Sequence, residues 1–262
     1  GITIMYASNY FETIMLNIAR GISATAPAKM YLALFLNDPG EGGSGTEVSY
    51  SGYARQEITF TAPAVDGTGM SFSNSAAITF ATAQITVGNA TFAGVFDSQT
   101  GGNMYLYGQL GTPITIESGV APVVRANTMK WIWTGKFSNN YKTKIMNLMR
   151  GINVSGFTPY LALCNGSPEA GGSEFSGNNY ARTSMAFSAP AEQANGSMMI
   201  SNSARVESPV ASGIWGNMTH VALYDASTSG NPYLIDTSSS QVLMNNGKSV
   251  IYEAGTFNIY VN

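Results

Sequence analysis

Charged residues are scarce in this sequence. Asp, Glu, Lys and Arg make up 10% of its 262 residues, and the formal net charge is −3, whereas about a quarter of an ordinary soluble domain is charged. Lys and Arg do not cluster anywhere along the chain. Because binding to a phosphate backbone depends on concentrated positive charge, we expect no nucleic-acid partner.

Cysteine and histidine are almost absent as well. Cys164 is the only cysteine and His220 the only histidine. A single thiol excludes an intrachain disulfide and a cysteine-based metal site, and no closely spaced acidic run has the pattern of a calcium loop. No uncharged apolar run approaches the roughly 18–20 residues that cross a bilayer. We therefore expect no metal, no cofactor and no membrane partner.

The chain does contain a long internal repeat. Arg20-Gly21-Ile22 returns as Arg150-Gly151-Ile152, and Tyr53-Ala54-Arg55 returns as Tyr180-Ala181-Arg182. Two further matches pair Phe60-Thr61-Ala62-Pro63 with Phe187-Ser188-Ala189-Pro190, and Ser73-Asn74-Ser75-Ala76 with Ser201-Asn202-Ser203-Ala204. The matches are collinear, and hydrophobic residues make up 44% of the chain, enough for each half to bury a core. The sequence predicts two tandem domains, residues 1–134 and residues 135–262.

Each half is predicted to open with one short helix. In the first half, Asn9 and Glu12 have the spacing of a capping box, and Gly21 follows the last apolar residue of the stripe. In the second half, Ser138 or Asn139 is expected to cap the helix.

After each helix the sequence changes to short segments rich in Val, Ile, Thr, Phe and Tyr, separated by Gly, Asn, Asp and Pro. This pattern is typical of antiparallel strands. We expect strands near 30–36, 53–61, 77–81, 90–97, 103–110, 113–117 and 128–134, and near 159–164, 180–188, 204–208, 218–225, 232–237, 240–245 and 255–261. The predicted fold is mainly β: two tandem antiparallel β-sandwich or jelly-roll-like domains, each preceded by one short α-helix.

Two acidic residues and one arginine recur in both halves. They are Glu47, Arg55 and Asp97 in the first half, and Glu174, Arg182 and Asp225 in the second. Paired carboxylates could form a glycosidase site. A set present twice in one chain is better explained as a structural ion pair that each domain needs in order to fold, so we expect no catalytic residue.

The two side chains best suited to catalysis or metal binding occupy positions where the other half has phenylalanine. Cys164 matches Phe35, and His220 matches Phe92. No Gly-x-Ser-x-Gly motif presents a serine for a triad with His220. Both side chains are therefore expected to pack rather than react.

Long glycine-rich connections separate the early strands, at residues 37–52 and 165–178. Loops of this length commonly carry contacts. Tyr50, Asn178 and Asn179 are the loop contact candidates, because aromatic rings and amides suit sugar stacking and hydrogen bonding.

Several motifs occur in a recognisable order. Tyr31-Leu32-Ala33-Leu34-Phe35 is followed by Gly45-Thr46-Glu47-Val48 and Gly52-Tyr53-Ala54-Arg55, and later by Phe96-Asp97 and Gly101-Gly102-Asn103. With these motifs the sequence resembles a family of bacteriophage virion structural proteins commonly labelled tail-fibre or minor structural proteins. The second half carries the same motifs with more changes.

The resemblance implies a non-enzymatic virion protein that decorates or cements the capsid, or forms part of the tail. Its implied partners are other virion proteins, with copies of the chain forming a homo-oligomer in the particle, and its synthesis would take place in the host cytoplasm. The alternative is a receptor-binding tail adhesin that recognises a host-surface glycan.

Overall fold

The computed structural model describes residues 1–262, and the contacts among them divide the chain into two compact units. Unit 1 contains Gly1–Ile14, Thr25–Thr134 and Thr143–Val154. Unit 2 contains Met15–Ala24, Gly135–Lys142 and Ser155–Asn262. Each unit therefore includes a short stretch from the opposite half of the sequence. The predicted domain boundary at 134/135 remains a prediction.

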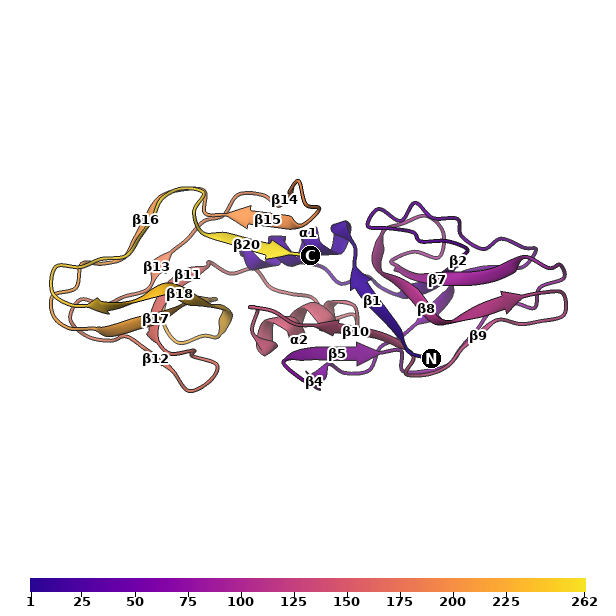
Figure 1. Cartoon of the computed structure of the whole chain (residues 1–262), viewed down its shortest axis with the longest axis horizontal. Coiled ribbons are helices and arrows are strands. Elements are labelled where there is room, and N and C mark those ends of the chain that lie inside the picture. The colour runs from indigo at the N-terminus through magenta and orange to yellow at the C-terminus, as the bar shows by residue number, and fades with distance from the viewer. The chain divides into compact units, whose positions relative to one another are not determined.

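Unit 1 is built on one curled sheet of eight strands, in the order β3-β2-β7-β8-β1-β10-β5-β4 (Figure 1). These strands are β1 (Thr3–Ala7), β2 (Met30–Phe35), β3 (Gln56–Ile58), β4 (Ala64–Asp66), β5 (Gly69–Ser73), β7 (Gly88–Phe96), β8 (Met104–Ile116) and β10 (Met129–Trp133). A separate pair consists of β6 (Ile78–Thr79) and β9 (Val123–Val124).

Unit 2 has no counterpart of β1, and its strands are divided among two sheets and one separate pair. A five-stranded sheet contains β11 (Tyr160–Asn165), β12 (Ser173–Glu174), β13 (Thr183–Ser184), β17 (Gly216–Tyr224) and β18 (Pro232–Met244). A three-stranded sheet contains β14 (Ala191–Glu192), β15 (Met198–Ser201) and β20 (Asn258–Val261). A separate pair consists of β16 (Val206–Glu207) and β19 (Ile251–Tyr252).

Strand β1 accounts for the undivided sheet of unit 1. It pairs in parallel with β10, from Thr3 opposite Met129 to Met5 opposite Trp131, and antiparallel with the start of β8. It lies so close to β8 that a Cβ atom on Gly108 would come within 2.2 Å of the Ile4 carbonyl oxygen. Only glycine leaves room for the strand there.

The matching positions of β18 carry side chains. Ala93 pairs with Gly108, whereas its counterpart Val221 pairs with Asp236, and Ser239 matches Gly111. No strand joins β18 to β20.

The two helices are α1 (Asn9–Ala19) and α2 (Asn139–Leu148). The predicted cap Asn9 is wrong by one residue, because the Ser8 hydroxyl accepts the Phe11 N–H, as the Ser138 hydroxyl accepts the Tyr141 N–H. At the end of α1, Ile22 N–H donates to the Asn17 carbonyl and Gly21 has a φ of 97°, the geometry of a Schellman motif.

Neither helix is long and apolar enough to cross a membrane.

Aromatic rings fill much of the core of unit 1. Phe60 stacks on Phe72 at a centroid distance of 4.2 Å, Phe72 meets Trp131 edge to face, and Phe11 brings α1 against Trp131.

The mainly β prediction is confirmed, and several details differ. The chain also forms β1 ahead of α1, the hairpin partners β4 and β5, and a parallel pair between β1 and β10. The strands predicted near 103–110 and 113–117 are one strand, β8, and those near 232–237 and 240–245 are likewise one, β18. In β8 a bulge places residues 110–113 opposite Thr91 alone, so Gly111 and Pro113 are accommodated without a turn.

Candidate functional site

In unit 1, the recurring arginine forms the centre of a polar cluster that we call the clamp. The guanidinium of Arg55 binds the Glu47 carboxylate through two nitrogens, with Nη2 at 2.9 Å from Oε1 and Nε at 3.1 Å from Oε2. The Arg55 side chain is 9% exposed and that of Glu47 is 27% exposed. The guanidinium carbon also lies 3.7 Å from the ring centroid of Phe96. This is a bidentate, partly desolvated pair with a cation–π contact.

The remaining terminal nitrogen of Arg55 fixes the loop between β7 and β8. It donates to the carbonyls of Ser98 at 3.0 Å and Gly101 at 2.6 Å. Tyr53 completes the clamp: its hydroxyl donates to Glu47 at 2.8 Å and accepts the Leu34 N–H at 3.1 Å. Burial, followed by the nearby Glu47 charge, raises the pKa of Tyr53 above its usual range.

Unit 2 contains the same clamp. Arg182 binds Glu174 at 2.9 Å, donates to the Ala226 and Ser229 carbonyls at 2.8 and 2.7 Å, and lies 3.6 Å from the Tyr224 ring centroid. The Tyr180 hydroxyl donates to Glu174 at 2.6 Å. Burial lowers the pKa of Arg182, but the hydrogen bond and charge of Glu174 outweigh it, so the net shift is upward.

The recurring aspartates, Asp97 and Asp225, do not bind the arginine of the clamp. Asp97 accepts the Asn103 N–H at 2.7 Å and the Asn103 side-chain amide at 3.2 Å. Asp225 accepts the Asn231 N–H at 2.8 Å. The structure thus brings Glu47 and Arg55 together and uses Asp97 to close the loop that Arg55 holds. A purely structural role for these six residues remains a prediction.

A buried asparagine in each unit was not identified from the sequence. Asn74 is fully buried; its amide donates to the Ala76 and Arg125 carbonyls, and its oxygen accepts the Thr128 and Met129 N–H groups. Asn202 makes equivalent bonds in unit 2, including those to Glu253 and Phe257. The sequence signal for these asparagines is the Ser-Asn-Ser-Ala motif, which is present in both halves.

The loop contact candidates differ in exposure. The expectation that Tyr50 is exposed is wrong: the ring is 8% exposed, and its hydroxyl donates to the Ala81 carbonyl. It packs against Tyr53 and so belongs to the core beneath the loop. Asn178 and Asn179 are exposed, with φ values of 50° and 68°, and their amides donate to the Ile214 and Val210 carbonyls.

The lone cysteine and histidine occupy ordinary packing positions. Cys164 is fully buried, and burial raises the pKa of its thiol to about 12. His220 is half-buried in β17, with Nδ1 at 2.8 Å from the Thr219 hydroxyl. No three His, Cys, Asp or Glu side chains are grouped so as to hold a metal ion.

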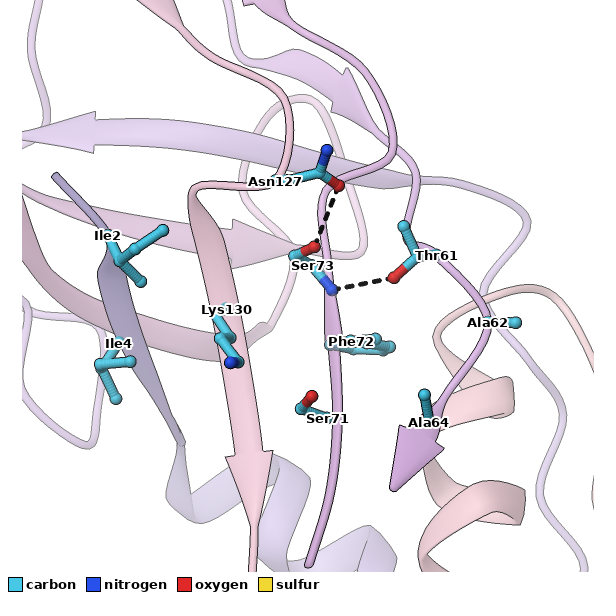
Figure 2. Close-up of a pocket in the computed structure, with 10 residues that line it drawn as sticks. All are labelled: Ile2, Ile4, Thr61, Ala62, Ala64, Ser71, Phe72, Ser73, Asn127 and Lys130. Carbon is cyan, nitrogen blue, oxygen red and sulfur yellow. Dashed lines mark hydrogen bonds between the residues drawn. The ribbon is translucent and has the colours of Figure 1, made fainter. Parts of the chain in front are cut away.

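Unit 1 also has two hollows beside β1. A groove of about 310 Å³ lies on the sheet face (Figure 2): Ile2, just before β1, and Ile4 of β1 border it on one side, Ala62 and Ala64 on the other, and Lys130 lies between them. Lys130 is paired with Asp66 at 2.8 Å.

The second hollow, which we call the crevice, has a volume of about 430 Å³. It is lined by residues of β8, β9 and β10 and by the start of the chain: Gly1, Thr3, Leu110, Thr112, Pro113, Ile114, Val123, Val124, Arg125, Thr128 and Met129.

Comparison with known proteins identifies the repeat as a family domain. A family model described as podophage GP4 fiber I protein gp80 matches residues 6–131 and again residues 136–260. No curated protein matches the chain. Since the two matches together cover nearly all of the sequence, the chain belongs to the podophage GP4 fiber I protein gp80 family and carries two copies of its domain in tandem.

Proposed function

We propose that this chain is a non-enzymatic structural subunit of a phage fibre, in which it associates with other virion proteins and with copies of itself. The family match over both repeats carries this proposal, because a fibre protein is a component of the particle. The same match favours a place in a fibre over a place on the capsid shell. The family match also supports a location of the protein in the virion.

The clamp supports a non-enzymatic role. A glycosidase needs two carboxyl groups on either side of the scissile bond, about 5–10 Å apart. In each unit the partly buried glutamate is instead bound to an arginine and a tyrosine, and the recurring aspartate is bound to a loop backbone. The recurring acids are thus engaged in contacts within their own domain, which supports a structural role.

Locating the chain in intact particles tests the fibre assignment. We expect antibody labelling, or a cryo-EM map with this chain fitted, to place it in the fibres, and a phage lacking the gene to assemble particles without them. Labelling confined to the capsid shell would overturn the fibre assignment.

Polysaccharide turnover tests the non-enzymatic assignment. We expect the purified chain to leave host polysaccharide intact. Depolymerisation by the wild type that is lost in the Glu47→Gln, Glu174→Gln double variant would show that these acids are catalytic.

The alternative function is a receptor-binding adhesin, which the exposed amides of Asn178 and Asn179 favour. Glycine tolerates the positive φ at both sites, so the Asn178→Gly, Asn179→Gly variant keeps the local backbone conformation. It also removes the amide hydrogen bonds to Ile214 and Val210, so circular dichroism must show that the variant is folded. Binding to a host-glycan array that is lost in this variant would support the adhesin. Absence of binding by the wild type would eliminate it.

A further inference from the structure

We propose that the crevice of unit 1 binds an extended, acidic segment of a neighbouring virion protein. This inference rests on the proposed function and adds a contact surface to it. The geometry, the lining chemistry and the difference between the two repeats each support it.

The crevice lies between two strands that each have a side without a partner strand. β1 pairs with β8 only at Tyr107 and Leu106, and the start of the chain follows β8 as far as Thr112, whose hydroxyl accepts a hydrogen bond from Gly1 at 3.0 Å. Beyond it, the Ile114–Ile116 part of β8 is paired with β7 alone. β9 pairs with β6 alone. Residues of both strands line the same hollow. Strand edges that flank a cavity suit an extended peptide, because its main chain can hydrogen-bond to them.

The lining combines apolar side chains, three threonines and one cationic side chain. Leu110, Ile114, Val124 and Met129 supply apolar walls, and Val123 at the rim is 48% exposed. The crevice volume is within the 300–1,000 Å³ range typical of ligand sites.

Arg125 is the one charged side chain in this lining, and it is exposed. Its own carbonyl is held by Asn74 and Thr128, which fixes the backbone from which the guanidinium extends. An apolar side chain next to a carboxylate complements this surface, because a guanidinium binds a carboxylate through charge-assisted hydrogen bonds.

The second repeat lacks this chemistry at the same place. Asn74 binds the carbonyl of Arg125 just as Asn202 binds the carbonyl of Glu253, so these two residues correspond. The charge is reversed, and Glu253 is already paired with Arg205 at 3.1 Å. Ser238 and Gln241 stand where the first repeat has Leu110 and Pro113. The crevice is therefore specific to unit 1, and the second repeat supplies its internal control.

Peptide binding to the full chain tests the crevice directly. The probe is a fluorescent, capped six-residue peptide of alternating valine and threonine with one aspartate, compared with a twin that has asparagine instead. We expect the aspartate peptide to bind at least about tenfold more tightly than its twin, which corresponds to ~1.4 kcal/mol, and this preference to shrink as salt rises.

Two variants assign the binding to the crevice. Arg125→Glu copies the second repeat and should abolish the preference for aspartate, and Val123→Trp should block the rim by its bulk without adding charge. Arg205→Gln removes an exposed arginine of unit 2 and should leave binding unchanged. Circular dichroism checks that each variant is folded. Equal binding of both peptides, or aspartate-specific binding that survives Arg125→Glu, would overturn the proposal.

A photo-crosslinking amino acid in place of Val123 extends the test to particles. We expect crosslinks to an extended segment of a virion protein that contains Asp or Glu. Crosslinks to a glycan, or to a basic or helical segment, contradict the inference. If the chain is located in fibres and no acidic segment crosslinks, only this inference fails; if the chain is absent from particles, the proposed function itself fails.

Discussion

The two units share their polar clamps and differ in the strand at the centre of the sheet. Both retain the glutamate–arginine–tyrosine clamp and the buried asparagine with nearly identical geometry. Only unit 1 has β1 between β8 and β10. From this comparison we expect that the clamp and the asparagine are what each domain needs in order to fold, whereas the central strand is an addition that only the glycines of β8 permit.

The largest expected effect comes from breaking a clamp. Arg55→Leu leaves Glu47 and the loop carbonyls without their donor, and loss of one partner of a buried pair typically costs about 3 kcal/mol or more. We expect the free energy of unfolding of unit 1 to fall by about 3 kcal/mol in urea denaturation, and Arg182→Leu to lower that of unit 2 by a similar amount.

A matched control for the clamp is Arg205→Leu, since Arg205 is about half exposed and its ion pairs face solvent. Exposed pairs contribute about 0–1 kcal/mol. A clamp variant that is no more destabilised than this control would show that the clamp is dispensable.

The second prediction converts the first repeat toward the second. Gly108→Asp places a side chain where the Ile4 carbonyl lies, so β1 must move. Overpacking of this kind costs about 1–3 kcal/mol. We expect a loss of about 2–3 kcal/mol in unit 1, together with faster proteolysis within residues 1–8.

The reverse change, Asp236→Gly, removes only a partly exposed pair with Lys136. It should alter stability by about 1 kcal/mol or less. Equal effects of the two changes would contradict the idea that glycine at 108 exists to admit β1.

The buried asparagines should matter equally in the two units. Asn74→Ala and Asn202→Ala each leave buried carbonyls and N–H groups unsatisfied, and each unsatisfied group costs about 1–3 kcal/mol before water or relaxation compensates. We expect a loss of about 2 kcal/mol in each case, measured by urea denaturation. A large loss in one unit alone would show that the equivalence of the two asparagines does not extend to their energetics.

The effect that is smallest at neutral pH concerns the position where one unit has Cys164 and the other Phe35. Because the pKa of the thiol is raised to about 12 in the fold, the unfolded chain loses its proton first as pH rises above about 9. Stability contributed by this group is therefore lost with rising pH, by at most about 1.4 kcal/mol per pH unit.

The Cys164→Val variant should show a shallower decline of stability between pH 9 and 11. In the wild type, a thiol reagent at pH 8 should react only on unfolding. Rapid modification of the native protein would contradict the burial of Cys164.

Much of this architecture could be predicted from local signals. The helix ends at Gly21 and Gly151 follow from a C-terminal glycine after an apolar stripe, and the β7 and β17 strands follow from β-branched and aromatic runs. The Glu47–Arg55 pairing can be predicted because both residues recur in the second half. These features depend on neighbours in sequence or on the internal comparison.

Other features depend on contacts distant in sequence. Thr3–Ala7 has the β-branched and aromatic composition of a strand. Its place between β8 and β10 has no local signal, because the partner β10 lies more than a hundred residues along the chain. Tyr50 lies in a segment that the sequence predicts as a loop. In the fold its ring is buried and its hydroxyl donates to the Ala81 carbonyl, 31 residues away. The Gly111-Thr112-Pro113 stretch has the composition of a turn, and only the bulge opposite Thr91 shows why β8 continues through it.

The exchange of helical stretches sets an order of events during synthesis. Unit 1 includes Thr143–Val154, so it cannot be completed when the ribosome reaches the end of the first repeat and must wait for α2 to emerge. Met15–Ala24 is made early yet belongs to unit 2, so it waits for almost the whole remaining chain. We therefore expect a nascent chain that stops near residue 134 to hold an unfinished unit 1, which is completed only after α2 has been synthesised.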